Sequence, residues 1–322
     1  VNNVEVIPVP AAPLAASETP PAAVPDRAPP AATQAEVPAR PIAGEQPKAT
    51  VTAEQQRQIS TVVQTLFPVE VSTPGNGDAA MIELPLSLHD AIGPMTDSAR
   101  RLDAVNAYWR LREKMALLEV ERASLATAER MYQTLSTDAQ RSGAAITPEL
   151  KALIASFESE TLSGKSREAA LRIDIRYLQI ELMQKMGRAP DNGWPVPTSL
   201  PYCGPAYRLE SENVRHNTFV LATEAIFIPE KLKAAQQMAL ALGAIPYLLT
   251  PELEQIAQVD DGWLYLRILR NKRESAKICI ETFISLNQSI ARYVTEYAAD
   301  TNVSGTIFAN SLIGSRDKAD TP

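Results

Sequence analysis

A long apolar stripe with alternating three- and four-residue spacing runs from Leu266 to Tyr297. It consists of Leu266, Leu269, Ala276, Ile280, Phe283, Ile290, Val294 and Tyr297, with Arg273 and Asn287 at its remaining positions. Such a stripe repeats every seven residues and predicts a helix whose seam must be covered by another long helix. Asn287 is either a polar contact that fixes the register or a residue at the wet edge of the seam.

Residues 97–139 are the first candidate for a covering helix. They contain neither Gly nor Pro, and their apolar residues recur at the same spacing along two adjacent flanks. At 1.5 Å per residue such a helix is roughly 65 Å long, which exceeds the width of an ordinary domain. The segment therefore predicts an elongated molecule.

The segment after residue 143 predicts a returning helix. Thr147 can cap its start, Pro148 suits the first helical position, and Gly187 suits the position just after its end. Gly164 is a candidate break within it. Residues 96–187 are thus expected to form a first antiparallel hairpin of long helices.

A second hairpin is expected over residues 229–300. Pro and Gly residues crowd the segment 188–228, which predicts a connector without helix. Pro229 is expected to start the third long segment, and Pro251 the fourth, which carries the long stripe. The polar residues 301–322 are expected to form a flexible tail.

The N-terminal part of the chain divides into two segments. Residues 1–50 mix many prolines with Ala, Val, Glu and Ser and have no aromatic residue, which predicts a disordered, extended leader. The alternative is a ligand for a proline-recognising domain. Residues 51–95 predict a short helix, opened by a capping box of Thr52 and Gln55 and stopped by Pro68, and then a loop with room for one turn around residues 86–92.

The predicted fold class is mainly α, with elongated, antiparallel, coiled-coil-like hairpins behind the leader. A composition with 45% hydrophobic but only 6% aromatic residues suits helix-on-helix packing. The residues that we expect to pack the helices together or to form interfaces are Tyr108, Trp109, Leu111, Met115, Leu178, Leu182, Ile280, Phe283, Ile290, Tyr293 and Tyr297.

Composition and motifs argue against several classes of function. A net charge of −7 and a pI of about 5.1 disfavour nucleic acid and anionic membranes as partners. Cys203 and Cys279 form no metal or disulfide pattern, and neither His89 nor His216 has a carboxylate or cysteine at ligand spacing. The pair at 260–261 supplies too few ligands for a cation. We therefore expect no enzymatic activity, metal or cofactor.

A basic cluster on the last predicted helix is a candidate binding site. It consists of Arg267, Arg270, Lys272, Arg273 and Lys277, and it could bind an anionic partner. Acidic residues lie beside it on the same predicted helix, so we expect exposed charges paired with neighbours one turn away.

Three stretches resemble TolC-like outer-membrane efflux proteins: residues 102–111 (LDAVNAYWRL), 182–190 (LMQKMGRAP) and 287–298 (NQSIARYVTEYA). The resemblance implies a wall of helical hairpins contributed by three protomers in the periplasm, and a role in transport or export. It also implies a location in the cell envelope and envelope export proteins as partners. The motifs describe helical surfaces rather than catalytic residues.

The chain departs from that family in one respect. No pair of roughly ten-residue segments alternates apolar and polar residues as transmembrane strands do, and no transmembrane helix is evident. The chain is therefore either a fragment or a divergent member, and any signal peptide is absent or already removed before Val1. The alternative function is a coiled-coil interaction scaffold that forms no conduit. Self-association is expected through the doubled flanks, Tyr108 with Trp109 and Ile290 with Tyr293.

Overall fold

A computed structural model describes residues 51–68, 83–141, 147–188, 193–204, 219–244 and 259–301. The chain divides into two units, residues 1–48 and 49–322. The described elements of the second unit are six helices and two short strands, so the predicted mainly helical class is confirmed. The leader and the tail lie outside the described residues, apart from Thr301 at the end of the last helix.

The first helix, α1 (Ala53–Leu66), begins with the predicted capping box. The Thr52 side chain accepts a hydrogen bond from the Gln55 amide, and the Gln55 side chain accepts one from the Thr52 amide. Together these contacts satisfy two amides that the first turn of a helix leaves without partners. A five-residue helix, α2 (Leu88–Ile92), follows in the predicted loop, at the place where one turn was expected around residues 86–92.

Two strands that the sequence did not predict pair in parallel. β1 (Glu83–Leu86) lies beside β2 (Trp194–Pro197), with Leu84 opposite Pro195 and Leu86 opposite Pro197. Prolines cannot donate a backbone hydrogen bond to a neighbouring strand, so a Pro-rich sequence predicts a connector rather than a strand. A two-stranded ribbon tolerates them because each strand needs its donors on one side only.

The two longest helices before residue 188 are α3 (Ser98–Arg141) and α4 (Pro148–Met186). Thr147 caps α4, Pro148 occupies its first turn, and Gly187 ends it at a φ of 69°, all as predicted. The ion pairs between the helices run in opposite residue order, from Lys185–Asp103 and Arg110–Glu181 at one end to Lys165–Glu129 at the other.

Gly164 lies inside α4 and does not break it. A Cβ atom at this position would lie 3.1 Å from Cδ1 of Leu125 on α3. Because real Cβ atoms rarely approach another atom so closely, the glycine allows the two helices to come together at this level.

The last two helices are α5 (Phe219–Ala244) and α6 (Val259–Thr301). α5 begins well before Pro229 and contains it, so the prediction that residues 188–228 lack helix is wrong for 219–228. A proline inside a helix removes one backbone hydrogen bond, and the neighbouring Ile228 is fully buried in the core, which contributes favourable packing at this level. The predicted start at Pro251 lies outside the described residues.

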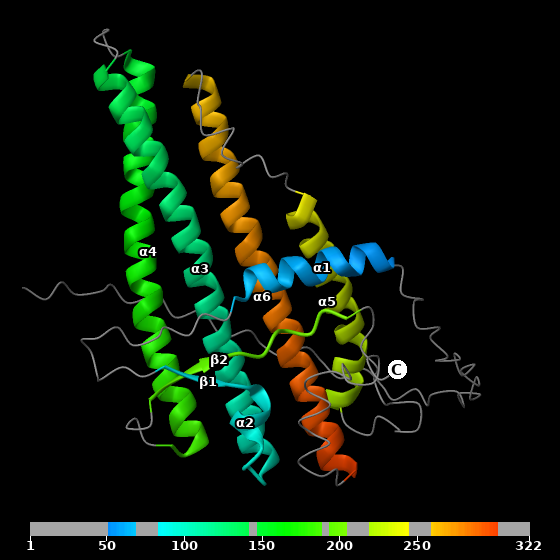
Figure 1. Cartoon of the computed structure of the whole chain (residues 1–322). Coiled ribbons are helices and arrows are strands. Elements are labelled where there is room, and N and C mark those ends of the chain that lie inside the picture. Colours follow the sequence, from blue (N-terminus) through cyan, green and yellow to red (C-terminus); the bar gives the residue numbers. More distant parts are fainter. Residues whose placement is uncertain are drawn as a thin grey trace, which may run out of the picture. The chain divides into compact units, whose positions relative to one another are not determined.

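The long helices lie side by side, as Figure 1 shows, with α3 in contact with both α4 and α6, and α5 packed on α6 and α1. Most buried apolar residues form one core that joins all six helices. A second cluster holds the distant ends of α3, α4 and α6 together, and it comprises Met131, Leu135, Leu153, Phe157, Tyr265 and Leu266. None of the helices in the described segments is long and apolar enough to cross a membrane.

Candidate functional site

The predicted packing residues lie inside the protein. Tyr108, Trp109, Leu111, Leu178, Leu182, Ile280, Phe283, Ile290 and Tyr293 are all buried, and Met115 is half-buried against the same core. Tyr297 lies on α6, but its side chain is outside the described part. The doubled flanks expected to meet a neighbouring copy are therefore already covered within the chain, so self-association cannot use them.

Tyr108 illustrates why its flank is unavailable. Its ring packs edge-on against Trp109, with centroids 5.4 Å apart. Its hydroxyl donates to the Leu86 carbonyl at 3.0 Å and accepts from the Ser199 amide at 2.8 Å. The side chain thus ties α3 to both strand segments, and burial raises the pKa of its hydroxyl.

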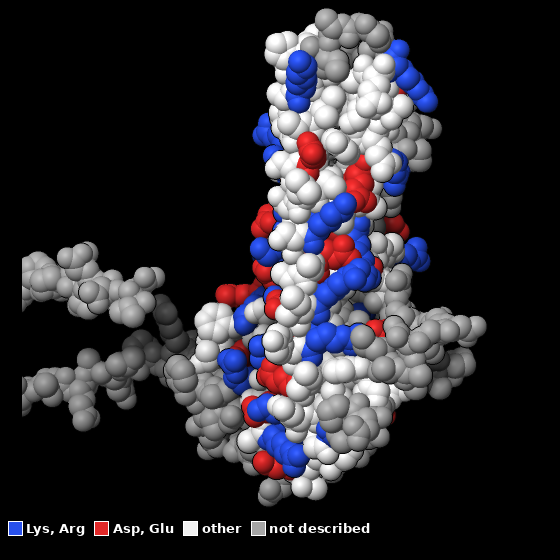
Figure 2. All heavy atoms as spheres, turned by 90° about the vertical axis from the view of Figure 1, so that its left-hand side faces the viewer, with Lys and Arg blue, Asp and Glu red and all other residues white. Residues whose placement is uncertain are grey.

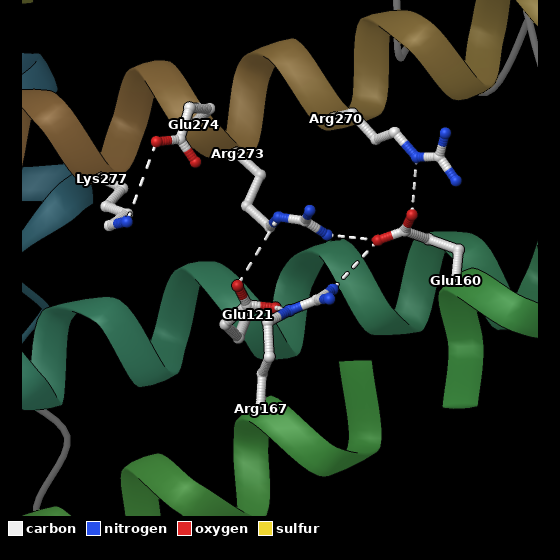
Figure 3. Close-up of polar contacts among 7 residues, drawn as sticks. All are labelled: Glu121, Glu160, Arg167, Arg270, Arg273, Glu274 and Lys277. Carbon is white, nitrogen blue, oxygen red and sulfur yellow. Dashed lines mark hydrogen bonds and ion pairs between the residues drawn. The ribbon is translucent and has the colours of Figure 1, made fainter. Parts of the chain in front are cut away.

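A cluster of charged residues joins α3, α4 and α6, as Figure 3 shows. Glu160 of α4 lies at its centre and is only 7% exposed. The Glu160 carboxylate accepts hydrogen bonds from Arg167 at 2.9 Å, from Arg270 at 2.7 Å and from Arg273. Glu121 of α3 completes the cluster and accepts from Arg167 at 3.0 Å.

The cluster compensates for the burial of the Glu160 charge. Burial alone would raise the pKa of this carboxyl, but the hydrogen bonds from Arg273 and Arg270 and the nearby guanidinium charges lower it to about 2. The carboxylate is therefore ionised at every physiological pH. Charged hydrogen bonds of this kind are roughly twice as strong as neutral ones, so the cluster fixes α6 against the α3–α4 pair.

These contacts correct the expectation that the basic cluster of α6 pairs within its own helix. Arg270 and Arg273 reach across to Glu160 on α4, and Arg273 also lies 3.6 Å from Glu121 on α3. Among the described ion pairs of this cluster, the one within α6 joins Lys277 to Glu274 at 3.8 Å. The sequence did show Arg273 inside the apolar seam, which was the one signal of a buried interhelical contact.

An extended segment, residues 193–204, crosses the helices and is held by their side chains. Gln179 of α4 donates to the Pro195 carbonyl, and Gln56 of α1 donates to the Cys203 carbonyl. Asn287 of α6 accepts from the Tyr202 amide at 3.0 Å and donates to the Phe283 carbonyl. Asn287 is therefore a buried polar contact of the seam rather than a residue at its wet edge.

Arg112 fastens the end of α1 to α3. Its side chain is 1% exposed, donates to the carbonyls of Phe67 and Pro68, and lies over the Phe67 ring at 5.5 Å. Burial lowers the pKa of its guanidinium to about 10, which still leaves it charged at neutral pH. Carbonyl partners and an aromatic face thus stabilise a buried cation that has no carboxylate among the described contacts.

The outer faces of α4 and α6 expose large apolar side chains. On α4 these include Leu162, Ile173 and Tyr177, which are 62%, 57% and 69% exposed. On α6 they include Leu264 and Ile278, at 57% and 42%. Figure 2 views the side of the molecule on which α4 lies, where basic and acidic side chains are interspersed with uncharged ones. The sequence does not predict these faces, because the inner stripes of the same helices contain more large apolar residues.

Hollows indent the described surface, and two of them are lined in part by arginines. One, of about 590 Å³, lies between α3 and α4 and is lined by Met115, Leu118, Ile175, Tyr177 and the side chains of Arg122 and Arg172. The other, of about 750 Å³, lies beside α2 and is lined by His89, Arg101 and Arg188. Arg122 and Arg172 of the first hollow are engaged with Glu168 of α4, whereas Arg176, which also lines it, donates to the Gln179 side chain.

The histidines and aspartates that were considered as possible metal ligands do not lie together. His89 lies in α2 rather than in a loop, and Asp260 and Asp261 lie in the first turn of α6, where acidic residues favour the helix dipole. His216 falls outside the described residues. No group of three metal-ligating side chains is gathered anywhere in the described segments.

Comparisons with known proteins add no relative. No family, no curated protein and no solved structure matches this chain.

Proposed function

We propose that this protein is a non-enzymatic component of the cell envelope, similar to TolC-like outer-membrane efflux proteins. It acts in transport or export by helix packing. In this proposal α3 and α4 act as an antiparallel hairpin, and α6 lies beside it as part of the same wall. Several copies, three by the resemblance, assemble side by side.

The observation that carries the proposal is the arrangement of α3, α4 and α6. The three helices are long, lie side by side and are fastened by the buried Glu160 cluster. Leu162 and Ile173 on α4 and Ile278 on α6 remain exposed on faces away from α3. Apolar side chains repeated along the outer faces of a helical layer favour packing against further helices.

The mass of the protein in solution tests this function. A wall built from identical copies must close on itself, so sedimentation of the full chain at tens of micromolar should show a closed oligomer larger than a dimer. Fractionation of the producing cells should find the protein in the envelope. A monomer recovered from the cytoplasm would reject the proposal and leave an interaction scaffold, whose hairpins bind a partner without forming a conduit.

A further inference from the structure

The face of α4 that points away from α3 is free of charge along its centre. Its residues follow alternating spacings of four and three, and we call them the α4 stripe: Ala155, Ser159, Leu162, Ser166, Ala169 and Ile173. All six are exposed, and Tyr177 and Ile180 continue the face toward the end of the helix. An uncharged, exposed stripe with heptad spacing is the surface that a second helix covers in a coiled coil.

A matching stripe runs along α6. We call it the α6 stripe: Leu264, Ile268, Asn271, Ser275, Ile278 and Thr282. Its spacing alternates four and three in the same phase as the α4 stripe, and all its members are exposed or half-exposed. The inner seam of α6, which contains Phe283 and Ile290, lies on the other side of the helix and is buried.

The two stripes lie at the same level along the molecule. α4 and α6 both begin at the end of the layer that holds the second apolar cluster (Figure 1). Gly262 lies directly against the Leu153 side chain, and Arg270 binds Glu160 at 2.7 Å. Leu153 and Gly262 therefore mark matching levels on the two helices. Each member of the α4 stripe differs in residue number from one member of the α6 stripe by the same amount as Leu153 differs from Gly262, so these two residues also lie at matching levels.

Side-chain sizes at matching levels are complementary. The pairs are Ala155 with Leu264, Ser159 with Ile268, Leu162 with Asn271, Ser166 with Ser275, Ala169 with Ile278, and Ile173 with Thr282. In all but the fourth pair a large apolar side chain meets a smaller or polar one. Large side chains opposite small ones interdigitate without voids or overlap.

Charges beside the stripes are compatible with the same pairing. In two parallel coiled-coil helices, the residue at position g of a heptad on one helix lies beside the residue at position e of the next heptad on the partner, five positions further along. This geometry places Glu158 of α4 beside Lys272 of α6, and neither residue has an ion pair among the described contacts. It places Arg267, Glu274 and Glu281 beside Ser163, Ala170 and Tyr177. Like charges therefore do not meet along this contact.

The geometry points to an interface between two copies of this chain, in which the α4 stripe of one copy packs in parallel against the α6 stripe of the next. When copies are related by a rotation about an axis parallel to the helices, each residue keeps its height along that axis. The matched residues of the two stripes therefore come opposite one another without any shift along the helices. Because the two faces differ, the contact repeats from copy to copy and can close into a ring. The inference rests on the proposed self-assembly and specifies its surface and register.

Disulfide trapping tests the register. In full-length protein carrying Cys203→Ser, Ala169→Cys and Ile278→Cys are made as separate single variants, mixed and oxidised with copper phenanthroline. Native Cys279 can stay, because burial raises the pKa of its thiol to about 12. We expect a linked dimer in the mixture and little in either variant alone. Ala169→Cys mixed with Leu264→Cys, two heptads out of register, should not link.

A charge substitution tests the surface without relying on a disulfide. Ile278→Glu should raise the dissociation constant of the oligomer by about tenfold or more, whereas Ile226→Glu, on an α5 side chain that is 63% exposed, should not. Circular dichroism checks that both variants remain folded. An oligomer that resists Ile278→Glu, or that links only through the out-of-register pair, overturns this inference while leaving the proposed function standing. A wild-type monomer rejects both.

Discussion

Replacing Glu160 with Gln should destabilise the protein, because it removes the one carboxylate that three arginines share. The side chain keeps its shape, but Arg167 and Arg273 are left with Glu121 as their acidic partner in the cluster, and Arg270 loses its contact with a carboxylate there. A pKa lowered from 4.5 to about 2 corresponds to about 3 kcal/mol at neutral pH. Arg270 and Arg167 are 49% and 36% exposed, so solvent screening reduces our expectation to about 2 kcal/mol.

The loss should depend on pH in a defined direction. The pKa of Glu160 is lower in the folded state than in the unfolded chain, so its contribution is fully present above about pH 4.5. As the pH falls from 4.5 toward 2, the carboxylate becomes protonated and the contribution disappears. Wild type and Glu160→Gln should therefore differ at pH 7 and converge near pH 2.

Urea unfolding followed by circular dichroism at pH 7, 4.5 and 2.5 measures this difference. Glu274→Gln is the matched control, because Glu274 is 59% exposed and its ion pair among the described residues is with Lys277, one turn away. Its effect should stay within about 0.5 kcal/mol. Equal losses for the two variants at pH 7, or a Glu160→Gln loss that persists unchanged at pH 2.5, would refute the reasoning.

Three further outcomes follow from burial and composition. Leu153→Ala should cost about 2–5 kcal/mol in urea unfolding, because Leu153 is fully buried between Phe157 and α6; a loss below 1 kcal/mol would contradict this packing. A thiol reagent at pH 8 should label Cys203, which is half-exposed, but label Cys279 only after unfolding; rapid labelling of both would show that α6 opens. Deleting residues 1–48 should leave the melting temperature nearly unchanged, and a drop of many degrees would show that the leader packs on the helices.

Local signals in the sequence identified the helix ends. The capping box at Thr52 and the start of α4 at Thr147 are found in the structure where they were predicted, and so is the end of α4 at Gly187. Each depends on hydrogen bonds between residues within one turn, so neighbouring residues suffice to specify it. Pro229 shows the limit of such rules, because α5 continues through a residue that usually starts or stops a helix.

The Glu160 cluster and the crossing segment could not be predicted in the same way. Three-four spacing places Arg273 on the inner seam of α6, but it does not say which helix lies opposite or that Glu160 is at that level. Likewise, nothing near Tyr202 in the sequence marks Asn287 as the partner of its amide. The outer stripes could not be predicted as exposed surfaces, because spacing alone does not distinguish a buried stripe from an exposed one. The inner stripes of α3 and α6 are also stronger than the outer ones.

The mass of the full-length protein at tens of micromolar, measured by sedimentation equilibrium, tests the central claim of assembly through helix faces most directly. The account predicts a closed oligomer, with a trimer as the expected size, that dissociates on Ile278→Glu but not on Ile226→Glu. A wild-type protein that sediments as a monomer over the whole concentration range would contradict it.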